Sequence, residues 1–350
     1  GWCRPFEKVD FARGYLGKEY EWPISHAELT RFQAPACRIL EIPDQFEVES
    51  NEMGPMKPIA FQFSKPVRFR EKFGSLLQYA PNISLFLNAN LEDIQGTSRT
   101  IHRASFVGYH NRRLSIRARR FVFAMGGIEN SRFLLWFRDK YSDEYFDKKM
   151  PIGKYWMEHP HFTIGSAIVD KRKVSERYYS ISAKAQFDEG ILNCGFRVQH
   201  LNDEATKALI RDILCLAPSL GQSLVSLAGK NLVCGVRFRA AWEQSPKIQN
   251  NISLDTENDQ FGIPKPILNW TKSKFDRKTL ISSVERFNEW LLRIDGGRIR
   301  LDSWILNYDD YPLNDELAGY FELIFDKDSK EAEIAYFGIL EEYYEKKLGG

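Results

Sequence analysis

The sequence predicts an α+β protein in which a mixed α/β part is followed by a large antiparallel sheet with helices beside it. Residues 118–138, ARRFVFAMGGIENSRFLLWFR, are interpreted as a strand, a Gly-Gly turn and a helix. After residue 160, several segments of strand length either alternate apolar with polar residues or are continuously apolar. The chain has 350 residues, 43% of them hydrophobic and 14% aromatic, which is enough for two domains and a substantial core.

The first half begins with helical signals and ends with strands. Residues 25–28, SHAE, form a capping box that opens a helix, and Pro35 is expected to kink that helix or end its first part. Residues 43–75 are rich in Pro, Gly and charge, which indicates a long surface excursion. Between residues 83 and 124, four apolar or alternating segments predict a short antiparallel series that leads into the Gly-Gly turn.

The second half carries the larger sheet. Strand patterns occupy residues 162–170, 178–187, 194–201 and 233–244, and a helical pattern fills 201–217. Residues 250–270 predict a hairpin that turns through Gly262. A helix is expected from Asp276 to the glycines at 296–297, which stop it.

Composition restricts the partners and the compartment. The net charge of +2 argues against a nucleic acid or a membrane surface attracted by bulk electrostatics. No run reaches the length of about 18 apolar residues that a membrane span needs, and no signal peptide is recognised. The cysteines are far apart and show no CxxC pair, which favours buried free thiols in a reducing, cytoplasmic location over disulfides or zinc. They are Cys3, Cys37, Cys194, Cys215 and Cys234.

Seven collinear runs carry a family resemblance. They are GWCRPFEKVDF at 1–11, EWPISHAELTRF at 21–32, FQFSKPVRF at 61–69, ISLFLNANL at 83–91, AMGGIENSRFLL at 124–135, IGKYWMEHPHF at 152–162, and WEQSPKIQNNISLD with PKPILNWTKSKFDRKTL across 242–280. In this order and spacing, the chain resembles the glucose–methanol–choline (GMC) family of FAD-dependent oxidoreductases, in its bacterial choline-dehydrogenase-like branch.

The resemblance implies a division of the chain. Residues 1–75 would be a flavin-proximal and lid-like segment, 76–150 part of a Rossmann-like FAD-binding domain, and 151–320 a substrate-binding antiparallel domain flanked by helices. The first three residues would lie near the isoalloxazine ring, the 89–91 backbone near the adenine, and the Gly-Gly turn beside the cofactor. The implied cofactor-binding residues are Gly1, Trp2, Cys3, Asn90, Leu91, Gly126, Gly127 and Asn130. For Asn130, capping of the helix that follows the turn is at least as good an explanation.

Two departures from the family weigh against activity. The GxGxxG turn that seats the FAD pyrophosphate is absent, and the resemblance stops near residue 320, where the catalytic histidine motif would begin. Residues 321–350 contain no histidine and predict an amphipathic helix outside the family pattern. Alcohol oxidation needs a base for the hydroxyl proton, so no catalytic residue is assigned. His159 and His161 are a close pair, but no third metal ligand accompanies them, and no metal is expected.

Three hypotheses follow. The first is a portion of an FAD-dependent enzyme that oxidises the CH–OH group of an alcohol or sugar and is inactive as this chain alone. The second is a degenerate, non-catalytic homologue that binds a small molecule such as a carbohydrate. The third is a structural or interaction protein that keeps the scaffold and uses its C-terminal helix to meet a partner, which could be another protein or the missing segments.

Overall fold

A computed structural model describes residues 2–46, 54–65, 68–97, 100–141, 146–147, 149–216, 218–229, 233–306, 320–325 and 332–338. The helices are Lys8–Phe11 (α1), His26–Thr30 (α2), Gln33–Leu40 (α3), Phe69–Tyr79 (α4), Gly126–Tyr141 (α5), Ala183–Glu189 (α6), Asp203–Leu216 (α7), Pro218–Gly229 (α8), Lys274–Arg293 (α9) and Ser303–Leu306 (α10), with a 3-10 turn at Lys18–Tyr20. The strands are Trp2–Cys3 (β1), Met56–Ile59 (β2), Gln62–Phe63 (β3), Asn90–Thr97 (β4), Thr100–Val107 (β5), Arg113–Arg117 (β6), His161–Asp170 (β7), Tyr178–Ile181 (β8), Cys194–His200 (β9), Val233–Trp242 (β10), Asn251–Asn258 (β11), Pro264–Asn269 (β12), Arg300–Leu301 (β13), Tyr320–Phe325 (β14) and Ala332–Gly338 (β15).

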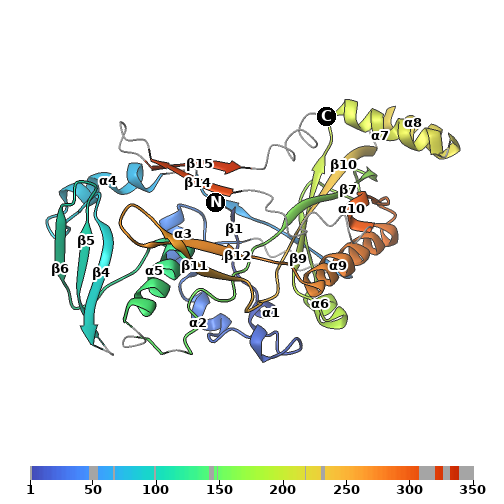
Figure 1. The fold of residues 1–350 in the computed structure, drawn as a ribbon. Helices are drawn as coiled ribbons and strands as arrows, with labels where there is room; N and C mark the ends of the chain where they lie inside the picture. Colours follow the sequence, from blue (N-terminus) through green and yellow to red (C-terminus); the bar gives the residue numbers. More distant parts are fainter. Residues whose placement is uncertain are drawn as a thin grey trace.

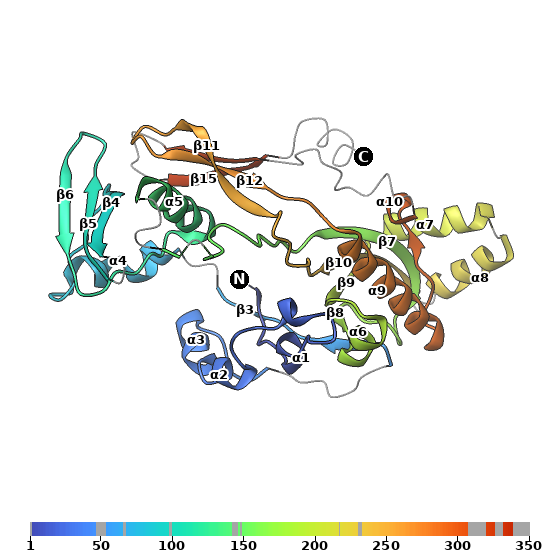
Figure 2. The same ribbon diagram turned by 60° about the horizontal axis from the view of Figure 1, so that its bottom comes forward.

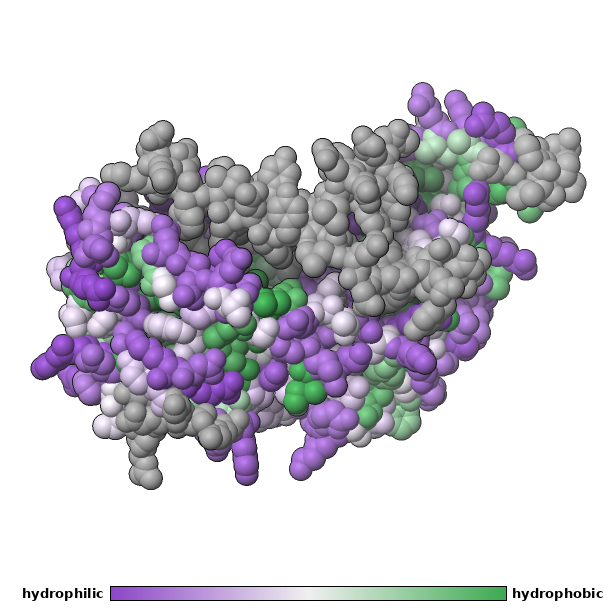
Figure 3. All heavy atoms as spheres, in the orientation of Figure 1, coloured by the Kyte–Doolittle hydropathy of each residue, from purple (hydrophilic) through white to green (hydrophobic). Residues whose placement is uncertain are grey.

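Two sheets of different size lie at opposite ends of the molecule. The three-stranded sheet β4-β5-β6 is at one end, and the six-stranded sheet β13-β7-β10-β9-β8-β2 is at the other (Figure 1). The hairpin β11–β12 and the N-terminal helices lie between them in both views (Figures 1 and 2). Hydrophilic side chains dominate the described surface in Figure 3, and the hydrophobic groups on it are small and separate.

The larger core lies between the six-stranded sheet and α9, which covers one face of that sheet (Figure 2). Ser273 and Asp276 form a capping box that starts α9. The helix buries one side against the sheet, including the ring of Phe287, which stacks on Phe196 with centroids 4.4 Å apart. The other apolar side chains that α9 buries are Leu280, Val284, Trp290 and Leu291.

A smaller core joins α5 to the three-stranded sheet. Phe133 and Phe137 of α5 pack with Ile94 of β4 and Ala104 of β5. Helix α5 also packs against both strands of the β11–β12 hairpin. Helix α5 is therefore the element that connects the small sheet to the hairpin.

The α+β prediction is confirmed, because helices occur together with antiparallel sheets. Every pairing recorded between the described strands is antiparallel, so within these residues the 76–150 segment shows no parallel Rossmann-like sheet. Within the described residues, no helix is long and apolar enough to cross a membrane.

Several predicted boundaries are wrong. Residues 118–125 form no strand, and α5 begins at Gly126 itself, so the Gly-Gly pair is the first turn of the helix rather than a loop before it. The 83–91 segment becomes a strand only at Asn90. The strand expected through residue 187 ends at Ile181, because Ser182 caps α6 by accepting a hydrogen bond from the backbone N–H of Ala185.

The C-terminal helix predicted for residues 321–350 is also wrong in the described part. The structure places the antiparallel strands β14 and β15 there. Both segments are rich in Tyr, Phe and Ile, which favour strands. The apolar residues spaced at helical intervals also fit an alternating strand pattern. The pattern alone does not distinguish a helix from strands.

Candidate functional site

A cavity of about 620 Å³ lies between the small sheet, α5 and the turn of the β11–β12 hairpin. We call it the β4–α5 pocket. It is lined by Ala89, Asn90, Leu91, Ala104, Phe106, Tyr109, Phe121, Val122, Phe123, Met125, Glu129, Arg132, Phe133, Asp259, Gln260, Phe261 and Ile263. Six of these seventeen residues are aromatic and come from four separate segments, so the pocket suits a flat, apolar ring system.

Of the predicted cofactor residues, Asn90 and Leu91 line the β4–α5 pocket. Gly126, Gly127 and Asn130 are not in its lining, although their neighbours Met125 and Glu129 are. The side-chain amide of Asn90 donates to the carbonyl of Val107 on β5 at 3.2 Å, so it also holds the start of β4 in place.

Gly126 and Gly127 are exposed at the start of α5. Gly126 has φ +85°, a conformation that favours glycine, although a Cβ at this position would meet nothing within 4 Å. Asn130 donates its side-chain amide to the carbonyl of Phe123 at 3.1 Å and accepts from the N–H of Met125 at 3.2 Å. Asn130 therefore ties the segment before α5 to the helix.

The charged residues of the pocket neutralise one another. Arg132 is 9% exposed and donates to Asp259 at 2.7 Å, to Glu129 at 3.1 Å, and to the carbonyls of Ile263 at 2.9 Å and Pro264 at 2.6 Å. Burial acts to raise the pKa of Asp259, but the hydrogen bonds from Arg132 and from backbone N–H groups outweigh it and lower that pKa. Arg132 thus clamps the hairpin turn to α5.

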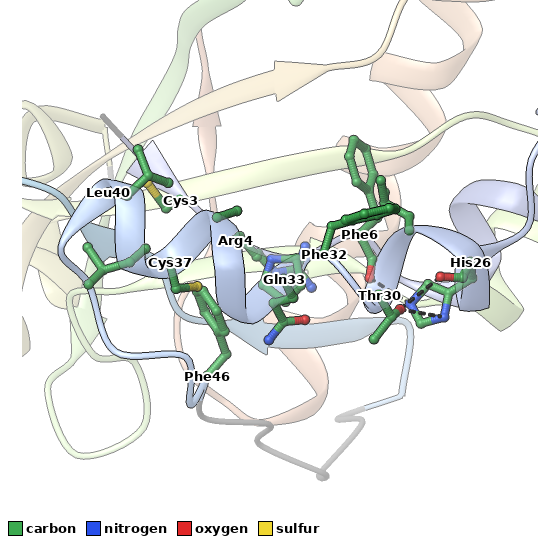
Figure 4. Close-up of a pocket in the computed structure, with 14 residues that line it drawn as sticks. Cys3, Arg4, Phe6, His26, Thr30, Phe32, Gln33, Cys37, Leu40 and Phe46 are labelled. Atoms are coloured by element: carbon green, nitrogen blue, oxygen red, sulfur yellow. Dashed lines mark hydrogen bonds between the residues drawn. The ribbon is translucent and has the colours of Figure 1, made fainter. Parts of the chain in front are cut away.

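The first three residues, which the resemblance predicts to lie near the flavin, are not in the β4–α5 pocket. Gly1 is outside the described residues, and Trp2 and Cys3 form β1, which pairs with β3. Cys3 lines a separate cavity of about 360 Å³ against α2 and α3 (Figure 4). In that cavity, His26 Nε2 lies 3.0 Å from the carbonyl oxygen of Phe6. The two cavities share no lining residue, so the structure does not bring all the predicted cofactor residues to one pocket.

Three of the cysteines are buried, as predicted, and Cys3 is half-buried. Cys37, Cys194 and Cys234 are buried and form no disulfide. Burial raises the pKa of the Cys194 thiol to about 12, so it stays protonated and unreactive. The side chain of Cys215 lies outside the described residues.

A third cavity, of about 520 Å³, lies on the six-stranded sheet and contains both His159 and His161. Arg197 and Arg239 share it, and sequence analysis did not single out either arginine. Their alternation with buried residues in CGFRVQH and VCGVRFRAAW was the available signal, because it places them on the face away from the core. Among the described residues, no group of three or more His, Cys, Asp or Glu side chains is arranged to hold a metal ion.

Comparison with known proteins gives little. No protein-family model matches the chain, and no curated protein matches it. The similar solved structures include a variant of the Aspergillus oryzae RIB40 formate oxidase, described for its effect on FAD modification, at 12% identity and a TM-score of 0.34. A second formate oxidase structure has 12% identity and a TM-score of 0.35. In each case the match covers 67% of this chain and 49% of the other, so the chain spans about half their length. Similarity this low carries no argument about function.

Proposed function

We propose that this chain is an FAD-dependent oxidoreductase scaffold of the CH–OH-oxidising kind, and that its β4–α5 pocket binds the adenine end of FAD. One observation carries the proposal. Residues 89–91, which the family resemblance assigns to the cofactor, line one cavity together with Met125 and Glu129, which flank the Gly126–Gly127 pair.

The pocket fits the adenine ring better than the diphosphate. Phe106, Phe123 and Phe261 offer flat surfaces for stacking. The charged side chains of the described lining are Glu129, Arg132 and Asp259, and the guanidinium of Arg132 is already shared between the two carboxylates. A diphosphate would therefore find no uncommitted cation in this lining, and binding of whole FAD by this chain should gain little over binding of its adenine half.

The consequence for activity follows from the same residues. Bound FAD would supply the hydride acceptor for oxidation of an alcohol or sugar. We expect this chain alone to bind FAD weakly and to turn over no substrate, because neither a diphosphate cradle nor a base placed at the β4–α5 pocket accompanies the adenine site.

Calorimetric titration with separate halves of the cofactor tests the proposal. AMP should bind, and FMN should bind at least about tenfold more weakly, because only AMP carries the adenine. Ala89→Trp fills the lining and should abolish AMP binding, whereas Ala124→Trp, an exposed residue outside the lining, should leave it unchanged. Tighter binding of FMN than AMP, or equal losses in both variants, would refute the assignment.

A further inference from the structure

A row of paired side chains crosses the six-stranded sheet on the face away from α9. In β9, Phe196 and Val198 are buried in the core, so Arg197 between them points to the opposite face. The register pairs Arg197 with Arg239 of β10 on one side and with Tyr178 of β8 on the other. All three residues line the 520 Å³ cavity, which we call the sheet cavity.

The Arg197–Arg239 pair is unusual for a sheet. Residues directly opposite in an antiparallel pair have Cβ atoms about 4.5–5.5 Å apart, and like charges in such pairs are destabilising. Nε of Arg239 is buried and has no hydrogen-bond partner. The described residues that line the cavity include no Asp or Glu. The cavity therefore concentrates positive charge and an unsatisfied donor.

Two histidines, His159 and His161, line the sheet cavity beside the arginines. His161 is the first residue of β7 and pairs with Ala241 of β10, and His159 lies two positions before it. Burial, followed by the positive charges of Arg239, His159 and Arg197, lowers the pKa of His161 to about 4. A neutral His161 beside two arginines can donate one N–H to an anion without adding repulsion.

The rest of the lining is apolar and aromatic. The rings of Phe61 and Tyr178 meet edge to face with centroids 5.0 Å apart, and Ile59 adds to the wall. The guanidinium of Arg197 lies 5.7 Å from the centre of the Tyr178 ring, which orients it along the wall. An inorganic ion would leave this apolar surface unused, whereas an organic acid would cover it.

We propose that the sheet cavity binds a small organic acid, with its carboxylate held between Arg197 and Arg239 and its carbon skeleton against Phe61 and Tyr178. Paired arginines suit a carboxylate because their planar groups donate two hydrogen bonds at once. The inference goes beyond the proposed function, since it requires neither FAD nor turnover, and the sheet cavity shares no lining residue with the β4–α5 pocket.

The test uses benzoate, the neutral isostere benzamide, and inorganic phosphate at one fixed ionic strength. Benzoate should bind and raise the melting temperature, and benzamide and phosphate should each bind at least about tenfold more weakly. Arg239→Gln should weaken benzoate binding by about tenfold or more. Arg237→Gln is the matched control, because Arg237 is exposed two positions earlier on β10 and lies outside the lining.

Without ligand, Arg239→Gln should melt no lower than the wild type, because it removes a like-charge pair. A loss of binding in this variant will therefore not reflect unfolding. AMP binding should be the same in this variant and the wild type, which separates this inference from the FAD proposal. Absence of benzoate binding, equal binding of benzamide, tighter binding of phosphate, or an equal loss in Arg237→Gln would each overturn the assignment.

Discussion

Arg132 of α5 donates to Asp259 in the hairpin turn, at 2.7 Å, across 127 positions of sequence. The same guanidinium reaches the carbonyls of Ile263 and Pro264 beyond that turn. One side chain thus sets the position of the hairpin relative to the helix, and this position defines one wall of the β4–α5 pocket.

Arg132→Met should lower the free energy of unfolding by about 3 kcal/mol, because it removes the charged partner of Asp259 and a donor to the carbonyls of Ile263 and Pro264. AMP binding should fall in the same variant, since the hairpin wall is released. Urea denaturation and calorimetric titration measure the two effects. Arg138→Met, later on the same helix, is the control and should change the free energy of unfolding by less than about 0.5 kcal/mol.

The two glycines that begin α5 should respond to alanine in opposite directions. Gly126→Ala places a Cβ on a residue with φ +85° and should destabilise by about 1–2 kcal/mol. Gly127→Ala puts its Cβ 3.6 Å from the ring of Trp156, an ordinary contact, and should stabilise the helix by about 0.5–1 kcal/mol. Equal effects in urea denaturation would contradict the positive-φ explanation.

His161 should give the protein a pH dependence in the acidic range. Its pKa is about 4 in the folded state against 6.5 for the free side chain, so the unfolded chain binds more protons between these values. The stability contributed by neutral His161 is complete above pH 6.5 and is lost as the pH falls toward 4. Urea denaturation of wild type and His161→Gln should show a smaller loss in the variant over this range.

Arg239→Gln should raise the pKa of His161, because it removes the largest of the neighbouring charges that lower it. The rise should be partial, since burial is the larger cause. The imidazole C–H resonances followed by NMR report this directly, with Arg237→Gln as the control. An unchanged titration in Arg239→Gln would show that the Arg239 charge does not act on this imidazole.

Local signals in the sequence predicted the helix starts well. The capping box predicted at Ser25 forms, and the helix carrying Pro35 is split into α2 and α3, with Pro35 in the first turn of α3. The helix expected from Asp276 begins two residues earlier, at Lys274. Such signals depend only on neighbours along the chain. The end of α9 near Gly296 was predictable for the same reason.

Features that depend on distant partners were not predictable. Residues 118–124 have the composition of a strand but form none in the structure, and a single sequence does not reveal this. The alternation of β9 and β10 placed Arg197 and Arg239 away from the core, but their direct opposition depends on sheet order and register. That Asn90 and Glu129 of α5 line the same pocket likewise depends on the fold and could not be predicted from the sequence.

The β11–β12 hairpin has two strands, and a two-stranded hairpin is marginally stable on its own in water. It is held by α5 and by backbone hydrogen bonds to Gly153 and Trp156, and the pocket it closes should open whenever the hairpin detaches from α5. A ligand in the pocket would oppose that opening, so amide hydrogen exchange along residues 251–269 should slow when AMP is present. The rate at which the hairpin detaches from α5 would then limit how fast the ligand enters and leaves the pocket.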